Sequence, residues 1–419
     1  MNLPRLALMS LASRWPTAIL SMLAIAFSVM LFLGVEKVRN GARASFADTI
    51  SGTDVIVGAR AGSVQLLLYS VFRIGNATNN VTWQTYETVR SRPEVEWSVP
   101  LSLGDSHRGY RVLGTTTGYF DHYRYRRDRE LVFKEGTRFD DLFDAVLGAD
   151  VAAALGYKIG QSIIVSHGLG RVSFTDHADK PFTVVGILAK TGTPVDRTVH
   201  VSLEAIEAIH ADWRGGSRDM RNKLSAEDVR KMDLSPKAIT AALVGLKSRL
   251  QVFRFRSAVN SYREEAITAV LPGVALAELW ELVGQAETAL AIVSGMVILT
   301  ALLGMVTMLL ATLNERRREM AILRSVGARP RTVVGLLVAE AGILTLGGVI
   351  VGALALYAVL FAVRGLIDDR FGLYIAFSPP TSWELWTLVG IVAAGLVVGL
   401  IPAWRAYRHS LADGMLVRS

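Results

Sequence analysis

Histidine and carboxylate side chains are concentrated in residues 166–179, where they could bind a metal ion. Two imidazoles and two carboxylates lie there, within the sequences Ser-His and Asp-His-Ala-Asp. Such groups are common ligands of zinc and similar ions. The candidate ligands are His167, His177 and Asp179, although their spacing matches no compact helical pair such as His-x-x-x-His. A solvated loop is the preferred interpretation of the same residues, so no metal site is predicted and these three are weak candidates.

Other catalytic patterns are missing from the 419 residues. There is no Gly-x-x-x-x-Gly-Lys-Ser/Thr loop for nucleotide phosphates and no Gly-x-Ser-x-Gly sequence of a serine hydrolase. Cysteine is absent, which excludes thiolate metal sites, thiol nucleophiles and disulfides. We therefore predict that the chain has no catalytic residue and no cofactor of its own, and that a partner hydrolyses any ATP used with it.

An arginine-rich segment, residues 314–331, lies between two long apolar runs and has the pattern of a docking helix. Met320, Leu323 and Val326 recur every three residues, which places them on one face of a helix. Gly327, which precedes Pro330 by three residues, is predicted to end that helix. The charged residues that complete the candidate contact surface are Glu315, Arg316, Arg318, Glu319 and Arg324.

Four stretches without Asp, Glu, Lys or Arg are long enough to cross a hydrocarbon core of roughly 30 Å. They are residues 15–35, 288–313, 341–363 and 385–404. We predict four transmembrane helices, at residues 15–38, 287–313, 332–363 and 385–404. Residues 364–384 then form a short outer loop.

The net charge of +8 is distributed as expected for a membrane protein. Residues 1–14 have a charge of +2, residues 314–331 of +4 and the tail 405–419 of +2, which accounts for the whole excess. Four crossings place these three segments on one side of the bilayer, and the positive-inside rule makes that side cytoplasmic. We therefore predict cytoplasmic N and C termini, a lipid bilayer as the surroundings and no nucleic-acid partner.

The first 44 residues could also be a cleaved signal peptide ending at Ala42-Arg43-Ala44. Their apolar run, residues 15–35, is longer than the usual roughly 7 to 15 residues of a signal peptide, so we predict an uncleaved anchor. Residues 1–14 are interpreted as a cytoplasmic, interfacial helix. A frayed extension of the first span is the alternative.

Residues 39–286 are predicted to form a large α+β extracytoplasmic domain between the first and second spans. Strand patterns occur at residues 55–57, 110–113, 162–165 and 182–188, bounded by Gly, Asp or Pro. Residues 140–155 and 249–271 have helical patterns. Charge-dense residues 212–237 indicate an exposed insertion or a mobile loop. The predicted fold class is a membrane protein with four transmembrane α-helices and this one large domain.

Two glycine pairs in the third and fourth spans allow close packing of transmembrane helices. They are Gly348 with Gly352 and Gly395 with Gly399, each separated by four positions. The missing side chains let two helix backbones approach. Packing within the chain is the main interpretation, and a specific dimer interface is the alternative.

The chain resembles the MacB/FtsX-type ABC transporter permeases, a family that includes the lipoprotein-release permeases. One basis is the topology, a first span near the N-terminus followed by a large outer domain. The others are sequences: Glu-Arg-Arg-Arg-Glu-Met-Ala-Ile-Leu-Arg-Ser-Val-Gly-Ala at 315–328, Glu-Ala at 340–341, Pro-Ala-Trp-Arg-Ala at 402–406, and the outer segments 145–152 and 155–160.

This resemblance implies a multi-pass, non-channel permease of the bacterial inner membrane that works as a dimer, with a second copy or a related permease. It also implies a cytoplasmic ABC ATPase dimer, which binds ATP and magnesium and contacts residues 314–331. Some family members have the ATPase ahead of the first span. Only 14 residues precede that span here, so a separate ATPase polypeptide is expected. A periplasmic adaptor or lipoprotein is a further candidate partner.

The leading functional hypothesis is mechanotransmission, in which ATP hydrolysis moves the periplasmic domain and drives export or extraction from the outer side of the membrane. An alternative is an FtsX-like transmembrane signal transmitter that activates a periplasmic partner such as a cell-wall hydrolase. A third is a metal or small-ligand receptor coupled to the ATPase, which rests on six of the seven histidines lying in residues 39–286.

Overall fold

The structure is a computed structural model that describes residues 3–126, 128–167, 179–214, 217–218, 224–315, 320, 322, 325, 327–371 and 379–408. The chain divides into two compact units. The helix unit comprises Met1–Asn40, Gly284–Gly365 and Ile375–Ser419. The α/β domain comprises Gly41–Val283 with Leu366–Tyr374.

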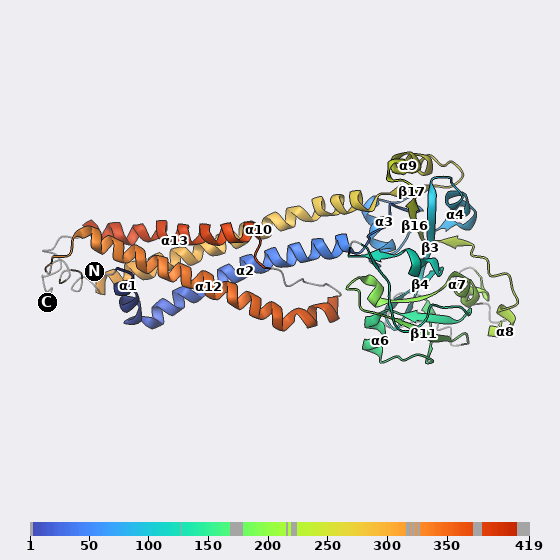
Figure 1. The fold of residues 1–419 in the computed structure, drawn as a ribbon, viewed down its shortest axis with the longest axis horizontal. Helices are drawn as coiled ribbons and strands as arrows, with labels where there is room; N and C mark the ends of the chain where they lie inside the picture. The colour runs from blue at the N-terminus through green and yellow to red at the C-terminus, as the bar shows by residue number, and fades with distance from the viewer. Residues whose placement is uncertain are drawn as a thin grey trace. The chain divides into compact units, whose positions relative to one another are not determined.

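Four long apolar helices confirm the four predicted spans. They are α2 (Trp15–Asp48), α10 (Pro272–Glu315), α12 (Pro330–Phe371) and α13 (Ser382–Arg408), all drawn in Figure 1. Each is longer than the predicted span. Both α10 and α12 begin at a proline, whose missing N–H is not needed in the first helical turn. A short helix, α1 (Leu3–Ala12), precedes α2 as a separate element.

The core of the helix unit lies where these long helices meet. Ile25 and Val29 of α2, Met305 of α10 and Leu344 of α12 are almost fully buried in one cluster, together with Ile391 of α13. The outward faces keep large exposed apolar side chains such as Phe27 and Leu354, as lipid-facing positions do. The helices are therefore apolar on both their packed and their exposed faces.

An 11-stranded mixed sheet forms the centre of the α/β domain, in the order β17-β1-β16-β3-β4-β12-β8-β11-β7, with β10 beside β3 and β9 beside β11. Its strands are β1 (Val55–Ala59), β3 (Val95–His107), β4 (Tyr110–Thr115), β7 (Phe133–Gly136), β8 (Asp144–Leu147), β9 (Ser162–Ile163), β10 (Ser166–His167), β11 (Phe182–Leu188), β12 (Thr198–Ser202), β16 (Ala241–Leu246) and β17 (Ile267–Val270). Three two-stranded pairs join β5 (Arg124–Tyr125) to β6 (Arg129–Glu130), β13 (Trp213–Arg214) to β14 (Ser217–Arg218), and β15 (Ala238–Ile239) to β2 (Val81–Thr82). Most pairings are antiparallel, and β12 with β4 and β11 with β8 are parallel.

Both faces of the sheet are covered at β1, which explains its continuous apolar sequence. Val55, Val57 and Ala59 enter one core cluster, whereas Ile56 enters another. Successive strand residues point to opposite faces, so a strand buried on both sides has no polar alternation. A third cluster surrounds β8, β11 and β12.

The helices that cover the sheet are short, and several begin at a side-chain cap. They are α3 (Ser63–Ser70), α4 (Trp83–Arg90), α5 (Gly118–His122), α6 (Ala149–Leu155), α7 (Leu203–His210), α8 (Ala226–Val229) and α9 (Val252–Asn260), with 3₁₀ turns η1 (Pro194–Arg197) and η2 (Arg249–Gln251). Thr82 accepts from the Thr85 N–H at the start of α4, and Ser202 accepts from the Ala205 N–H at the start of α7. Each cap satisfies an amide that lacks a partner in the first turn.

Two predicted helices of this domain were only partly correct. Residues 140–155 contain strand β8 followed by α6, and residues 249–271 contain η2, α9 and then strand β17. In both places a short buried strand adjoins a helix, and an apolar run of four residues does not distinguish the two. The predicted insertion 212–237 is structured where it is described. Asp212 and Val229 are buried, and Val229 belongs to the third core cluster.

Candidate functional site

Most of the candidate ATPase-coupling residues lie outside the described part of the chain. This applies to Arg316, Arg318, Glu319, Leu323, Arg324 and Val326 and to the side chain of Glu315, the last residue of α10. Met320 is half-buried and packs against a cluster that contains Leu313, Val333 and Ala403. Gly327 has a φ of 97°, a left-handed conformation that favours glycine, and α12 begins three residues later.

All four predicted packing glycines lie at contacts between helices of the helix unit. A Cβ on Gly348 would lie 2.7 Å from Ile25 of α2, and one on Gly352 would collide with the backbone oxygen of Ala26. On α13, a Cβ at Gly395 would collide with Thr345 of α12. A Cβ at Gly399 would lie 2.6 Å from the Cβ of Ala341. The glycines therefore allow α12 to approach α2 on one side and α13 on the other.

A buried ion pair joins α2 to α13. The ammonium of Lys37 lies 3.1 Å from the Glu384 carboxylate, and the two side chains are 6% and 1% exposed. Lys37 also donates to the carbonyl oxygen of Pro379 and lies 5.8 Å from the centre of the Tyr357 ring on α12. One cation is thus bound by groups from three parts of the helix unit.

Glu384 is held in place by the start of its own helix. Its Oε2 accepts from the Thr381 N–H at 2.7 Å, while the Thr381 hydroxyl accepts from the Glu384 N–H at 3.3 Å. This reciprocal arrangement is a capping box. Sequence reasoning missed the Lys37–Glu384 pair, although the Thr-x-x-Glu sequence at 381–384 is a recognisable capping signal that could have located Glu384 at a helix start.

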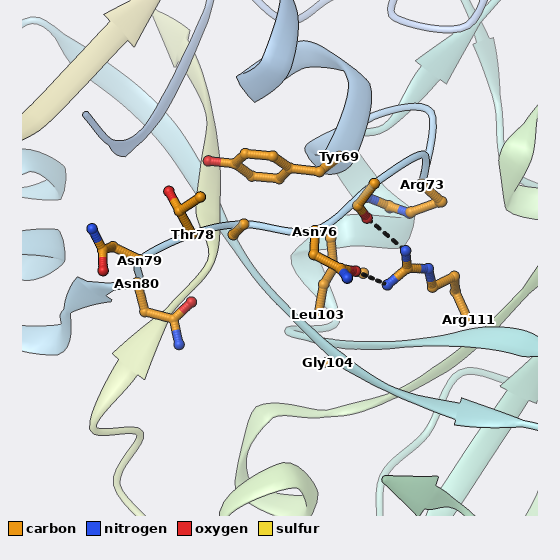
Figure 2. Close-up of a pocket in the computed structure, with 11 residues that line it drawn as sticks. Tyr69, Arg73, Asn76, Thr78, Asn79, Asn80, Leu103, Gly104 and Arg111 are labelled. Carbon is orange, nitrogen blue, oxygen red and sulfur yellow. Dashed lines mark hydrogen bonds between the residues drawn. The ribbon is translucent and has the colours of Figure 1, made fainter. Parts of the chain in front are cut away.

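Two cavities of the α/β domain share Arg73 and Arg111 as lining residues. The first has a volume of about 560 Å³ and is also lined by Tyr69 and by the Asn-rich residues 75–80 (Figure 2). Figure 2 shows Arg111 beside that segment, where it donates to Asn76 Oδ1 at 3.0 Å and to the Gly75 carbonyl oxygen at 2.5 Å. The second cavity has a volume of about 530 Å³ and is lined in part by Phe46, Phe72 and Arg197.

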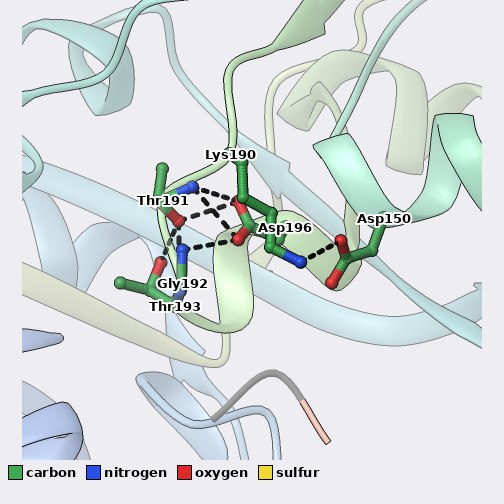
Figure 3. Close-up of polar contacts among 6 residues, drawn as sticks. All are labelled: Asp150, Lys190, Thr191, Gly192, Thr193 and Asp196. Carbon is green, nitrogen blue, oxygen red and sulfur yellow. Dashed lines mark hydrogen bonds and ion pairs between the residues drawn. The ribbon is translucent and has the colours of Figure 1, made fainter. Parts of the chain in front are cut away.

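A tight turn after β11 forms one side of the second cavity. Buried Asp196 accepts from the backbone N–H groups of Thr191 and Gly192, at 2.8 Å and 2.6 Å, and from the Thr191 hydroxyl (Figure 3). Burial raises the pKa of Asp196, whereas these hydrogen bonds oppose the increase. Lys190 forms an ion pair with Asp150 next to the turn.

The arginines of these cavities change the ionisation of their neighbours. Burial, reinforced by the positive charge of Arg73, lowers the pKa of His200 to about 3. Burial, with Arg73 nearby, also lowers the pKa of Arg111. Burial raises the pKa of Tyr69 to about 12. At neutral pH, therefore, His200 and Tyr69 are uncharged, and the charged residues that line the two cavities are arginines.

The candidate metal ligands are not brought together in the described residues. His177 and the side chain of His167 lie outside them, and Asp179 lies 3.7 Å from the ammonium of Lys180. Within the described ranges there is no group of three or more His, Asp or Glu that could hold a metal ion. The described histidines have other contacts: His107 bonds to Ile164 and Tyr157, and His122 stacks on Trp97.

Two family models match the chain. The MacB-like periplasmic core domain matches residues 18–260, which is more than half of the chain, and the FtsX-like permease C-terminal model matches residues 291–411. The chain belongs to the MacB/FtsX-like permease family. It is a multi-pass membrane protein with four spans and a periplasmic domain, which is the α/β domain described above.

Curated relatives of this permease include larger export proteins. The macrolide export ATP-binding/permease protein MacB of Nitrobacter winogradskyi is 24% identical over 406 residues, covering 93% of this chain and 56% of that protein. The pyoverdine export ATP-binding/permease protein PvdT of Pseudomonas syringae is 24% identical over 347 residues, covering 78% of this chain and 47% of that protein. The chain therefore spans about half the length of these relatives.

Solved structures of a periplasmic region and of an extracellular domain also match the permease. The periplasmic region of MacB from Actinobacillus actinomycetemcomitans has a TM-score of 0.34 and 11% identity, covering 55% of this chain and 94% of that structure. The extracellular domain of the transporter YknZ from Gram-positive bacteria has a TM-score of 0.30 and 12% identity, covering 52% of this chain and 98% of that structure.

Proposed function

We propose that this permease transmits work from an ABC ATPase dimer to its periplasmic domain and so drives export from the outer side of the inner membrane. The observation that supports this most is the presence of a MacB-like periplasmic core domain and an FtsX-like permease domain in one chain. Export is common to the names of relatives that handle different compounds, macrolides and pyoverdine. The substrate of this permease is therefore a separate question from its mechanism.

ATP hydrolysis has to come from residues other than these 419, because they contain no P-loop. The relatives are ATP-binding/permease proteins, which supports an ABC ATPase as the partner. An amphipathic helix with an apolar ridge can fill a groove on such a partner. We assign that role to Met320, Leu323 and Val326, with the arginines of 314–331 around them and the termini on the same, cytoplasmic side.

The spans themselves favour transmission of force over passage of a polar substrate. Residues 288–313, 341–363 and 385–404 contain no charged side chain, and the predicted span 332–363 adds only Glu340, which is buried. Proton- and ion-coupled transporters use chains of ionisable groups within the membrane. In the buried Lys37–Glu384 pair, the ammonium and the carboxylate lie 3.1 Å apart and neutralise each other.

Co-purification in mild detergent tests the docking role of the arginine-rich segment. We expect the Leu323→Asp variant to lose the ATPase, because a carboxylate cannot occupy an apolar groove without a large desolvation penalty. Ser325→Asp is the matched control, since it adds the same charge at an exposed hydroxyl and should retain the ATPase. Equal ATPase recovery with Leu323→Asp and with the unmodified chain would contradict the docking role.

Signal transmission to a periplasmic partner is the second candidate function. The match of residues 291–411 to an FtsX-like permease model favours it, whereas the MacB-like core domain favours export. Recovery of a cell-wall hydrolase bound to the periplasmic domain, with no exported compound, would decide for transmission. A bound adaptor or lipoprotein would decide for export.

A further inference from the structure

Two cavities of the periplasmic domain share a pair of arginines, Arg73 and Arg111, as lining residues. The lining residues suit one class of ligand. We propose that Arg73, Arg111 and Arg197 bind the oxyanion of an amphiphilic ligand, a phosphate or carboxylate group whose apolar part lies against Phe46 and Phe72. All of these residues line the second cavity, and Arg73 and Arg111 also line the first. This inference does not depend on the ATPase or on the proposed transmission of work.

The charge of the lining residues is the first argument. Three arginines line the second cavity, and no Asp or Glu is among the described residues that line either one. Arginine offers five N–H donors in a planar fork that fits carboxylate and phosphate groups. Like charges held close together in a partly desolvated site repel, so an anion bound between them is stabilised by both.

The conformation of Arg73 is the second argument. It has a φ of 60°, in the left-handed region that is unfavourable for a residue with a side chain. Its guanidinium donates to the Ser70 carbonyl oxygen, yet its Nε is buried without a hydrogen-bond partner. A buried donor left unpaired is itself destabilising. Asparagine or glycine would fit this backbone better, so the arginine is there at a cost in stability that anion binding would offset.

The apolar half of the second cavity is the third argument. Phe46, Phe72, Ile74, Tyr110 and Pro194 line it beside the arginines, and Ile74 is 54% exposed. A cavity of about 530 Å³ lies within the size range of small-molecule sites, which combine apolar walls with a few polar groups that orient the ligand. A purely inorganic anion would leave these apolar side chains without a partner.

Fixed structural elements hold the charged groups in position. Arg111 is oriented by Asn76 and Gly75 (Figure 2), and the turn from Thr191 to Asp196 is tied by its internal hydrogen bonds (Figure 3). Thr193 and Pro194 of this turn line the cavity directly. Arg197 follows at the end of η1, 5.8 Å from the Tyr110 ring centre. Such preorganisation lowers the entropic cost of binding.

Calorimetric titration of the full chain in a neutral maltoside detergent tests the proposal. The probes are hexyl phosphate, hexanoate, inorganic phosphate and hexanol, which separate the charge of the ligand from its apolar part. We expect both hexyl anions to bind, inorganic phosphate to bind more weakly and hexanol not to bind. Because hydrogen bonds to charged groups contribute strongly, Arg111→Gln should weaken hexyl phosphate binding by about tenfold or more.

Three further variants complete the test. Arg73→Asn should weaken binding while suiting the left-handed backbone, and Arg197→Gln does the same at an exposed position where folding is not at risk. Arg256→Gln is the matched control, because Arg256 is exposed on α9 and lines neither cavity. It should leave binding unchanged, and a thermal melt of each variant checks that it is folded.

Each remaining outcome overturns part or all of the assignment. If inorganic phosphate binds as tightly as hexyl phosphate, the site recognises a free oxyanion and not an amphiphile. If hexanol binds as tightly as hexyl phosphate, the arginines do not contribute to ligand recognition. No binding of any probe to the unmodified chain, or equal losses in Arg111→Gln and Arg256→Gln, would overturn the site altogether.

Discussion

Lys37 of the helix unit and the arginine pair of the periplasmic domain are cations removed from bulk water in two different ways. The ammonium of Lys37 meets the Glu384 carboxylate, the Pro379 carbonyl oxygen and the Tyr357 ring. Arg73 and Arg111 instead line cavities with no acidic residue among the described lining. Positive charge is thus neutralised within the chain at one place and left available at the other.

This difference separates a structural role from a binding role. A buried ion pair uses its attraction inside the protein, and removing one partner leaves an uncompensated charge. Arginines that repel each other gain from a ligand that the chain itself does not supply. Both sites contain buried or partly buried cations, so residue type alone does not distinguish them. The presence or absence of a counter-charge within the chain does.

Breaking the Lys37–Glu384 pair should have the largest effect on stability. Glu384→Gln leaves the Lys37 charge buried without its counter-charge, which should destabilise the helix unit by about 3–5 kcal/mol. Thermal unfolding of the full chain in detergent measures this loss. The double variant Lys37→Met with Glu384→Gln removes both charges and should recover most of the stability. If the double variant is no more stable than Glu384→Gln alone, the loss of stability does not come from an uncompensated Lys37 charge.

Adding a methyl group where α12 meets α2 should have the next largest effect. A Cβ at Gly352 collides with the backbone of Ala26, so Gly352→Ala should cost about 1–3 kcal/mol through overpacking. Gly390→Ala is the matched control, because no atom lies within 4 Å of a Cβ there. That variant should be neutral or up to about 1 kcal/mol more stable, since alanine favours helix over glycine. Equal melting temperatures for the two variants would contradict the close approach that also brings Tyr357 to Lys37.

Acid should destabilise the periplasmic domain through His200, next to Arg73. The folded-state pKa of His200 is lowered from 6.5 to about 3, so the unfolded chain binds a proton there that the folded chain does not. The stability due to neutral His200 is complete above pH 6.5 and is lost as the pH falls toward 3. Between pH 7 and 5 the unmodified chain should lose about 2 kcal/mol more than His200→Gln. Parallel stability curves for the two proteins would show that His200 titrates normally.

Replacing a cavity arginine should have the smallest effect on stability. Arg111→Gln loses hydrogen bonds to Asn76 and Gly75 at a partly exposed position but relieves repulsion from Arg73, so the change should stay within about 1 kcal/mol. Thermal unfolding beside Glu384→Gln gives the comparison directly. A loss as large as that of Glu384→Gln would assign Arg111 a structural role and remove the contrast between the two regions.

The membrane organisation could be predicted from the sequence because its signals are local. Charge-free runs of span length located all four long helices, and the glycine spacing in α12 and α13 fell at helix contacts. Length and composition determine such helices, since a bilayer leaves no other way to satisfy the backbone. The ends were less predictable, and α10 begins at Pro272, ahead of the predicted position 287.

The periplasmic domain was less predictable because its decisive contacts are distant in sequence. Strand β8 was interpreted as helix because its apolar residues fit either pattern, and only pairing with β11 and β12 makes it a strand. The cavity arginines gave no signal at all. Arg73, Arg111 and Arg197 belong to separate segments, and only the folded sheet brings them to one cavity. Lys37 and Glu384, separated by 347 positions, were missed for the same reason.

In the proposed mechanism, ATP hydrolysis moves the periplasmic domain. The chain has no cysteine, so one spin label can be placed at Ser91, an exposed residue that directly follows α4, and another at the same position of the second permease chain. The distance between the two labels is then measured by double electron–electron resonance in the complex with its ATPase. Trapping ADP with vanadate after hydrolysis should shift the distance distribution. The same distribution with and without the trapped nucleotide, in a complex that hydrolyses ATP, would contradict the proposed mechanism.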